Sequence, residues 1–255
     1  MVGPAAAGQP GSPPQREPAS DGPPPAVSST AARYLEATYY ISQEGERVRP
    51  SRLAEWLGVS APTVTGVIQR LHEQGLIESR PDRSLVLTPA GEAEAAAVVR
   101  RHRIVERWLT DALGLDWASA DEEAGRMSHA FSEPVLERIF RALGSPTTCP
   151  HGNEIPGAGL RPRRLQNLAQ LEPGSPAVIS RISEVAEHEA PQLLRLLEAE
   201  GLRTGVLVEV RREVGADAVT VLVGGRQTAL SLRAAQAVWV EAAQDSPPGP
   251  VPGAR

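Results

Sequence analysis

The sequence predicts an α+β protein with an N-terminal winged helix-turn-helix, a helical dimerisation domain and a C-terminal β-barrel. Three observations lead to this prediction. Apolar residues recur at helical spacing over residues 30–74 before a hairpin pattern, helical spacing continues to about residue 143, and short strand-like segments follow from Arg163. A chain of 255 residues is long enough for two or three compact units.

Both ends of the chain differ from the rest in composition. Residues 1–28 contain eight Pro and four Gly with almost no large apolar side chain, so burial cannot offset the entropy lost on ordering them. Residues 244–255 have the same character. We expect both ends to be disordered, and we assign the winged helix to 29–92, the helical domain to 93–160 and the barrel to 163–243.

The first unit has the pattern of a winged helix-turn-helix. Its third helix is the best marked, because Ser60 can cap it, Pro62 suits its first turn and Gly75 ends it. Segments 76–80 and 84–88 then predict the hairpin of the wing. The third helix is therefore in the position that enters the major groove of DNA. A small helical bundle with an incidental hairpin is the alternative.

DNA binding by this unit would depend on local side chains and not on overall charge. The formal net charge of the chain is −5, and residues 30–92 contain seven Arg against eight acidic residues. We therefore expect phosphate contacts from individual side chains, namely Arg70, Arg80 and Arg83.

Helices are predicted over 89–113, 119–131 and 133–143, and the second begins with a capping box of Ser119 and Glu122. The third carries four apolar residues on one face: Val135, Leu136, Ile139 and Phe140. Because little else in the sequence would bury this face, we expect it to pack against its two-fold mate in a homodimer.

The last unit changes to short apolar segments. Strands are predicted near 178–179, 206–210, 219–223 and 230–232, with one helix near 192–199. This pattern indicates a small all-β barrel with one helical insertion.

Several classes of protein are excluded. No apolar run approaches the ~18 residues that span a bilayer, and no signal sequence is evident, so we expect a cytoplasmic protein without membrane contact. A single cysteine, Cys149, rules out a disulfide framework and a thiolate zinc cluster in the monomer. We expect no enzyme, because nucleophile elbow, phosphate loop, His-Glu-x-x-His and paired-carboxylate patterns are all missing.

Three segments carry a family resemblance: Asp82-Arg83-Ser84-Leu85 with Leu87-Thr88-Pro89-Ala90-Gly91, Arg101-His102-Arg103 with Glu106-Arg107, and Pro150-His151-Gly152-Asn153 with Ile155-Pro156-Gly157. With them the chain resembles the diphtheria toxin repressor and manganese transport regulator family of metal-dependent transcription factors. The resemblance implies the long form of that family, whose barrel is an SH3-like domain resembling FeoA. It also implies DNA contacts from the start of the third helix: Ser60, Pro62, Thr63 and Thr65.

The resemblance further implies a metal site. His102 and Glu106 lie four apart on one helix, hence on one face, and match family ligands. Asp121 stands where the toxin-repressor branch has a His ligand, and Glu189 and Gln192 stand where its SH3-like domain offers Glu and Gln. The implied ion is Mn²⁺ or Fe²⁺, with other divalent transition metals possible.

Simpler explanations exist for these residues. A His and a Glu four apart commonly form a solvated helix face, and Asp121 can interact with the dipole of its helix. Glu189 and Gln192 can be polar surface residues. Cys149 with His151 resembles a metal pair, but the family has a loop there, so we interpret both as loop residues.

A second metal site of the family looks dismantled. Arg33 stands where a Met or Asp ligand is expected, Gly125 where a Cys or Glu is expected, and Ser128 where a Glu is expected. Arg33 keeps its proton and cannot be a ligand, although its charge can pair with acidic neighbours. His129 alone remains, as a ligand or as a packing residue.

We therefore expect a homodimeric repressor that binds double-stranded DNA at a palindromic operator. It would respond to Mn²⁺ or Fe²⁺ and control genes of metal-ion homeostasis. The alternative is a metal-independent winged-helix regulator with a degenerate metal site.

Overall fold

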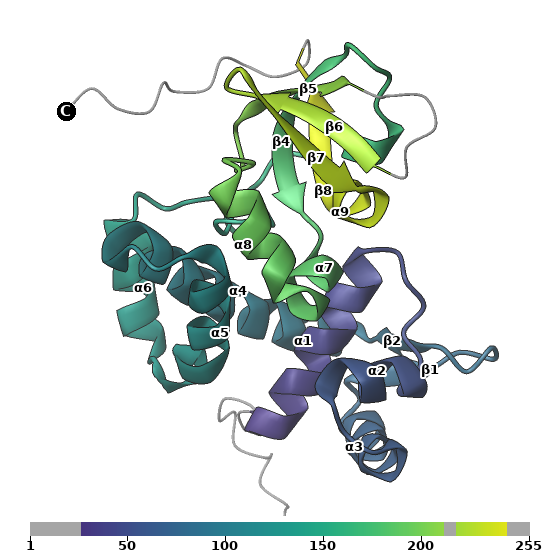
Figure 1. The fold of residues 1–255 in the computed structure, drawn as a ribbon. Helices are drawn as coiled ribbons and strands as arrows, with labels where there is room; N and C mark the ends of the chain where they lie inside the picture. The colour runs from purple at the N-terminus through teal and green to yellow at the C-terminus, as the bar shows by residue number, and fades with distance from the viewer. Residues whose placement is uncertain (1–26, 212–217, 244–255) are drawn as a thin grey trace, which may run out of the picture.

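The computed structural model describes residues 27–211 and 218–243, and it confirms the α+β class (Figure 1). Both predicted disordered ends lie outside the described residues, except for the last two residues of the N-terminal segment. Val27 packs against the hydrophobic core of the N-terminal unit, and Ser28 caps the first helix by accepting a hydrogen bond from the Ala31 N–H. The domain boundaries at 29–92, 93–160 and 163–243 stay predictions.

The N-terminal unit is a winged helix. Its elements are α1 (Ser29–Gln43), α2 (Pro50–Leu57), α3 (Ala61–Glu73), β1 (Ile77–Ser79) and β2 (Leu85–Leu87). Ser60 caps α3, and Val64 and Leu71 bury its inner face. The two strands pair antiparallel, so the predicted hairpin is present. The opposite face of α3 stays exposed beside the wing.

Three helices form the middle unit: α4 (Pro89–Leu113), α5 (Trp117–Met127) and α6 (Glu133–Ala142), with a short 3-10 helix η1 (Ser128–Ala130) after α5. The predicted capping box is wrong. Asp116 is the N-cap of α5, because its carboxylate accepts hydrogen bonds from the Ser119 N–H at 3.0 Å and the Ser119 hydroxyl at 2.6 Å. The helix therefore begins at Trp117, before the predicted start at Ser119, and Ser119 lies inside its first turn.

Three of the four residues on the face of α6 that we predicted as a dimer contact pack inside their own protomer. Leu136 is 1% exposed and Phe140 is 9% exposed, and both pack inside their own protomer against α4. Ile139 is partly buried against the same core. Only Val135, with 43% of its surface exposed, remains free to meet a second copy. The apolar face of α6 thus serves first to close the core of this unit.

The C-terminal unit is a six-stranded antiparallel sheet in the order β3-β8-β4-β5-β6-β7. Its strands are β3 (Gln166–Asn167), β4 (Pro176–Ile182), β5 (Leu207–Arg211), β6 (Ala218–Val223), β7 (Arg226–Ser231) and β8 (Val238–Ala242). Its helices are η2 (Leu168–Gln170), α7 (Glu184–Glu189), α8 (Pro191–Ala199) and α9 (Leu232–Ala237). The prediction of one helix missed α7 and α9, which at six residues each are too short to show helical periodicity.

The three units meet around α7 and α8, which lie between the sheet and the helices of the other two units (Figure 1). Trp117 at the start of α5 is 3% exposed and belongs to the core of the C-terminal unit. Within the described residues, no helix combines the length and the apolar character needed to cross a bilayer.

Candidate functional site

His102 of α4 lies between two carboxylates from different helices. Its Nε2 is 3.2 Å from Asp121 Oδ1 of α5, and its Nδ1 is 3.5 Å from Glu36 Oε1 of α1. The structure therefore joins the predicted residues His102 and Asp121, and it adds Glu36, which the sequence did not indicate. Because the two carboxylates face opposite nitrogens of one ring, these three side chains bridge three helices and do not converge on one point.

Charge in this bridge favours the imidazolium form. Burial alone would lower the pKa of His102, but the hydrogen bond to Asp121 and the charges of Glu36, Asp121 and Glu106 outweigh it and raise the pKa to about 10. Burial likewise opposes ionisation of Asp121, yet the hydrogen bond and charge of His102 lower its pKa. The metal-free bridge is therefore an ion pair at neutral pH.

Glu106 points away from this bridge, into a second and deeper cluster with Cys149 and His151. The three donor atoms lie within 4.8 Å of one another, and Glu106 Oε1 is 2.6 Å from His151 Nδ1. All three residues are at most 2% exposed. We name Glu106, Cys149 and His151 the inner cluster; the interpretation of Cys149 and His151 as loop residues overlooked them.

The inner cluster contains polar atoms that the protein leaves unsatisfied. Neither nitrogen of His151 nor Glu106 Oε1 has a partner with hydrogen-bond geometry, despite the short distance between the two side chains. An unsatisfied buried polar group costs about 1–3 kcal/mol. An imidazole, a thiol and a carboxylate are also the donor types that divalent transition metals accept. The inner cluster therefore fits a metal ion.

Helix α7 adds further acidic groups to the inner cluster. Glu187 Oε2 lies 3.5 Å from His151 Nδ1, and Glu184 is buried in an ion pair with Arg103. Burial, together with the charges of Glu184 and Glu106, raises the pKa of Glu187 well above its usual value. Excess negative charge at a buried position is relieved by a cation, so α7 of the C-terminal unit strengthens the fit.

The loop between α6 and β3 holds His151 against the sheet. The backbone O of His151 accepts a hydrogen bond from the Ile182 N–H at 2.8 Å. Asn153 Nδ2 donates to the Ile182 carbonyl at 3.0 Å and to Glu187 Oε1 at 2.9 Å. This loop therefore ties the inner cluster to β4 and α7.

Gly152 makes this close approach possible. Its φ is +86°, and an added Cβ would lie 2.0 Å from the Ser180 carbonyl oxygen. We expect Gly152→Ala to lower the free energy of unfolding by about 3 kcal/mol, as measured by denaturant titration. Gly157→Ala is the matched control, because its φ is +76° but nothing lies within 4 Å, so it should cost only about 1 kcal/mol. Equal losses in the two variants would contradict this packing argument.

Other predicted ligands lie elsewhere or cannot be assigned. The side chain of Glu189 lies outside the described residues. Gln192 is exposed and accepts a hydrogen bond from Arg195 at 3.4 Å, and His129 is exposed in η1. Arg33 is exposed on α1 and forms no ion pair within the part of the chain that the structure describes.

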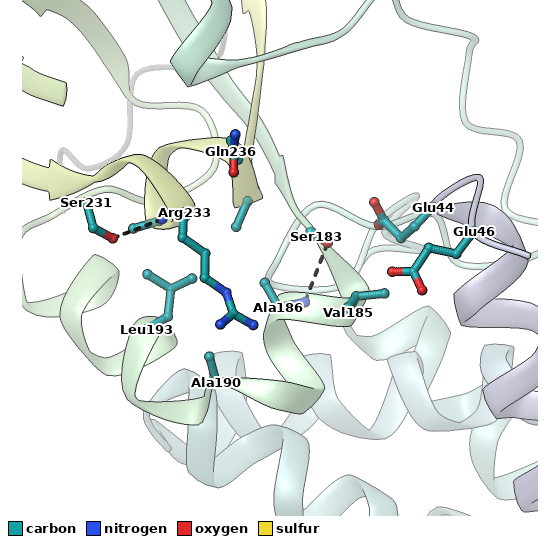
Figure 2. A pocket seen from close by; sticks show the side chains of 12 residues that line it. Glu44, Glu46, Ser183, Val185, Ala186, Ala190, Leu193, Ser231, Arg233 and Gln236 are labelled. Carbon is teal, nitrogen blue, oxygen red and sulfur yellow. Dashed lines mark hydrogen bonds between the residues drawn. The ribbon is translucent and has the colours of Figure 1, made fainter. Parts of the chain in front are cut away.

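A cavity of about 470 Å³ opens onto the bridge of Glu36, His102 and Asp121, and Glu106, Cys149 and His151 of the inner cluster do not line it. It is lined from α1, α4, α5 and α7, by Glu36, His102, Asp121 and Glu187 among others. A larger cleft of about 510 Å³ lies where α1 ends near α7 and α9, and Figure 2 shows Arg233 across it from Glu44 and Glu46. Both of those carboxylates already accept hydrogen bonds from arginines, at 2.5 Å and 3.0 Å, so this cleft offers no unsatisfied donor set for a metal.

The predicted DNA-contacting residues share the outer surface of the winged helix. All seven are exposed: Ser60, Pro62, Thr63, Thr65, Arg70, Arg80 and Arg83. A groove of about 380 Å³ between α3 and the wing is lined by Thr65, Arg80 and Arg83. His72 at the end of α3 hydrogen-bonds Ser79 of β1 at 2.9 Å, which fixes the helix relative to the wing.

Three family models match the chain in succession. Residues 26–85 match the N-terminal DNA binding domain of iron dependent repressors, and residues 88–157 match their metal binding and dimerisation domain. Residues 166–242 match the FeoA domain. Together the matches cover most of the described residues.

Whole-chain relatives agree with the domain matches. The chain is 36% identical over 223 residues to the iron-dependent repressor IdeR of Mycobacterium tuberculosis (strain ATCC 25618 / H37Rv), which covers 83% of this chain and 96% of that protein. It is 35% identical over 191 residues to the diphtheria toxin repressor of Corynebacterium diphtheriae, covering 71% and 84%. A solved manganese-dependent transcriptional repressor in complex with manganese has a TM-score of 0.75 and 33% identity, covering 83% of this chain and 99% of that one.

Proposed function

Because the chain belongs to the iron-dependent repressor family of metal-dependent, DNA-binding transcriptional repressors, we propose that it senses Mn²⁺ or Fe²⁺ and controls genes of metal-ion homeostasis. It would act as a homodimer on a palindromic operator in the cytoplasm. The observation that carries this proposal is the inner cluster, whose donors are buried, mutually close and unsatisfied.

We propose that Glu106, Cys149 and His151 hold the ion, with Glu187 close enough to join them. When bound, the ion supplies positive charge to a pocket that has an excess of carboxylates. Ligation by His102 and Asp121 stays a prediction, because these two side chains already satisfy each other with a hydrogen bond of 3.2 Å, whereas the inner-cluster atoms are unsatisfied. One ion per subunit is expected from the inner cluster, and two per subunit would indicate that His102 and Asp121 bind a second.

Helix α7 is the proposed link between the metal site and the DNA-binding unit. Glu187 faces the inner cluster, and the next residue, His188, reaches α2. The ring of His188 stacks on Trp56 with centroids 4.1 Å apart and an interplanar angle of 3°, and its Nε2 donates to the Trp56 carbonyl at 2.7 Å. Ordering of α7 at the metal site would therefore fix the helix that precedes α3.

The experiment that tests the function combines metal content with DNA binding. Purified protein should bind one Mn²⁺ or Fe²⁺ per subunit, and genomic fragments selected by the loaded protein should be released on chelation. Tight DNA binding that chelation leaves unchanged would favour the metal-independent alternative.

Metal affinity should rise with pH. Burial opposes the charged form of His151, but Glu106 outweighs it and raises its pKa, and burial raises the pKa of the Cys149 thiol. Both groups must lose a proton to become ligands, so binding releases protons. We expect the association constant for Mn²⁺ to rise by about tenfold to 100-fold per pH unit near neutrality, one factor of ten per proton released. A pH-independent constant in calorimetric titration would contradict ligation by these two residues.

The dimer proposal now depends on Val135, since Leu136 and Phe140 are already buried in the protomer. Val135→Asp should give a monomer in sedimentation experiments, because an unpaired charge in an apolar contact is costly. The protomer should still fold, because Val135 is exposed within it, and circular dichroism should therefore give a wild-type spectrum. Leu113→Asp, at a 54% exposed residue of α4, is the charge-matched comparison. A stable Val135→Asp dimer would remove α6 from the interface.

A further inference from the structure

The surface beside the wing carries two arginines outside the predicted set of DNA-contacting residues, Arg47 and Arg49. The backbone O of Val48 accepts a hydrogen bond from the Leu85 N–H at 2.8 Å, so residues 47–49 run alongside β2. Val48 is only 2% exposed, and its neighbours Arg47 and Arg49 are both exposed. In extended backbone, alternate side chains point to opposite sides, so both guanidinium groups face solvent.

These two residues lie next to the arginines of the wing. Asp82, in the turn between Arg80 and Arg83, has a carboxylate oxygen 3.7 Å from Arg47 Nη1. Hydrogen bonds from Ser84 chiefly lower the pKa of Asp82, and the charges of Arg47 and Arg49 lower it further. Both arginines are therefore close enough to the wing turn to act on the same carboxylate.

Positive charge predominates in this group. Five arginines of this region, Arg47, Arg49, Arg52, Arg80 and Arg83, stand against three acidic residues, Glu46, Glu78 and Asp82. The ion pair of Asp82 with Arg47 is exposed and therefore weak. Within the described ranges 27–211 and 218–243, Arg49, Arg80 and Arg83 form no ion pair. A local excess of positive charge on a chain with a net charge of −5 is the feature that would attract a polyanion.

The arginines also adjoin the groove between α3 and the wing. Pro50, which directly follows Arg49, lines this groove together with Thr65 of α3 and with Arg80 and Arg83. Phosphates flank any duplex segment whose bases are contacted by α3. We propose that Arg47 and Arg49 contact the DNA phosphate backbone and extend the phosphate-binding surface of the wing. This inference rests on the DNA-binding function given above.

The test measures how salt weakens binding of Mn²⁺-loaded full-length protein to a random-sequence duplex several helical turns long. Each phosphate contact contributes about 0.9 to the slope of log K against log salt concentration. Arg47→Ala/Arg49→Ala should therefore reduce the slope by about 1.8 per subunit and weaken binding to all sequences alike.

Two control variants separate local contact from net charge and from folding. Arg47→Lys/Arg49→Lys keeps the charges and should keep the wild-type slope. Arg211→Ala/Arg226→Ala removes two exposed charges from the barrel and should leave the slope unchanged.

A wild-type slope in Arg47→Ala/Arg49→Ala, or an equal loss in the barrel variant, would overturn the inference while the DNA-binding function stands. Failure of the loaded wild-type protein to bind any duplex would instead overturn the DNA-binding function and this inference with it.

Discussion

Replacing His151 by Ala should abolish the response of DNA binding to Mn²⁺. The imidazole is fully buried, its Nδ1 lies 2.6 Å from Glu106, and neither nitrogen has a partner with hydrogen-bond geometry, so both nitrogens are available to an ion. Loss of residues that merely support metal ligands costs about 10–100-fold in affinity, so loss of a ligand should cost at least about 100-fold. Calorimetric titration of Mn²⁺ and DNA affinity at fixed free metal measure the two effects.

Matched variants make this result specific. His129→Ala removes an exposed histidine of the same unit and should leave Mn²⁺ affinity unchanged, because His129 is not a member of the buried inner cluster. Glu106→Gln keeps the shape of its side chain but loses its charge, and should weaken Mn²⁺ binding by tenfold or more, about 1.4 kcal/mol per factor of ten. Wild-type Mn²⁺ affinity in both His151→Ala and Glu106→Gln would move the site to His102 and Asp121.

Replacing His188 by Ala should separate metal binding from DNA binding. Glu187 and the inner cluster remain, so Mn²⁺ affinity should stay near that of wild type. The stack on Trp56 and the hydrogen bond to its carbonyl are lost, so α2 is no longer held by α7. Coupling between sites is typically worth 5–150-fold, and we expect the DNA affinity of the Mn²⁺-loaded protein to fall by about tenfold.

His188→Phe distinguishes the two contacts, because it can keep the stack but cannot donate a hydrogen bond. It should fall between wild type and His188→Ala in DNA affinity. Unchanged DNA affinity in His188→Ala would show that α7 does not transmit the metal signal.

Local patterns made the winged helix predictable. The cap at Ser60, the apolar positions of α3 and the turn at the wing are all encoded within a few residues, and the structure contains each of them. The short helices α7 and α9 were missed because each spans fewer than two turns, which is too short for a helical period to show in the sequence. Because the winged helix was predicted correctly, the exposed residues of α3 and the wing could be assigned to one surface.

The proposed metal site was only half predictable because its donors come together from distant segments. The spacing of His102 and Glu106 put both on one face of α4, but the two side chains turn to different partners. Glu36 and His151 reach α4 only through tertiary packing, which leaves no spacing signal in the sequence. One signal was present: Cys149 and His151 are metal-binding residue types two apart in a loop, and we interpreted them as structural.

The central claim is that metal and DNA bind to the same form of the protein, and linkage tests it most directly. A metal that tightens DNA binding must itself bind more tightly in the presence of DNA, by the same factor. The measurement is the dissociation constant for Mn²⁺ with and without saturating operator fragment, compared with the change in DNA affinity caused by Mn²⁺. We expect two equal factors well above one. A dissociation constant for Mn²⁺ that DNA leaves unchanged would contradict the account.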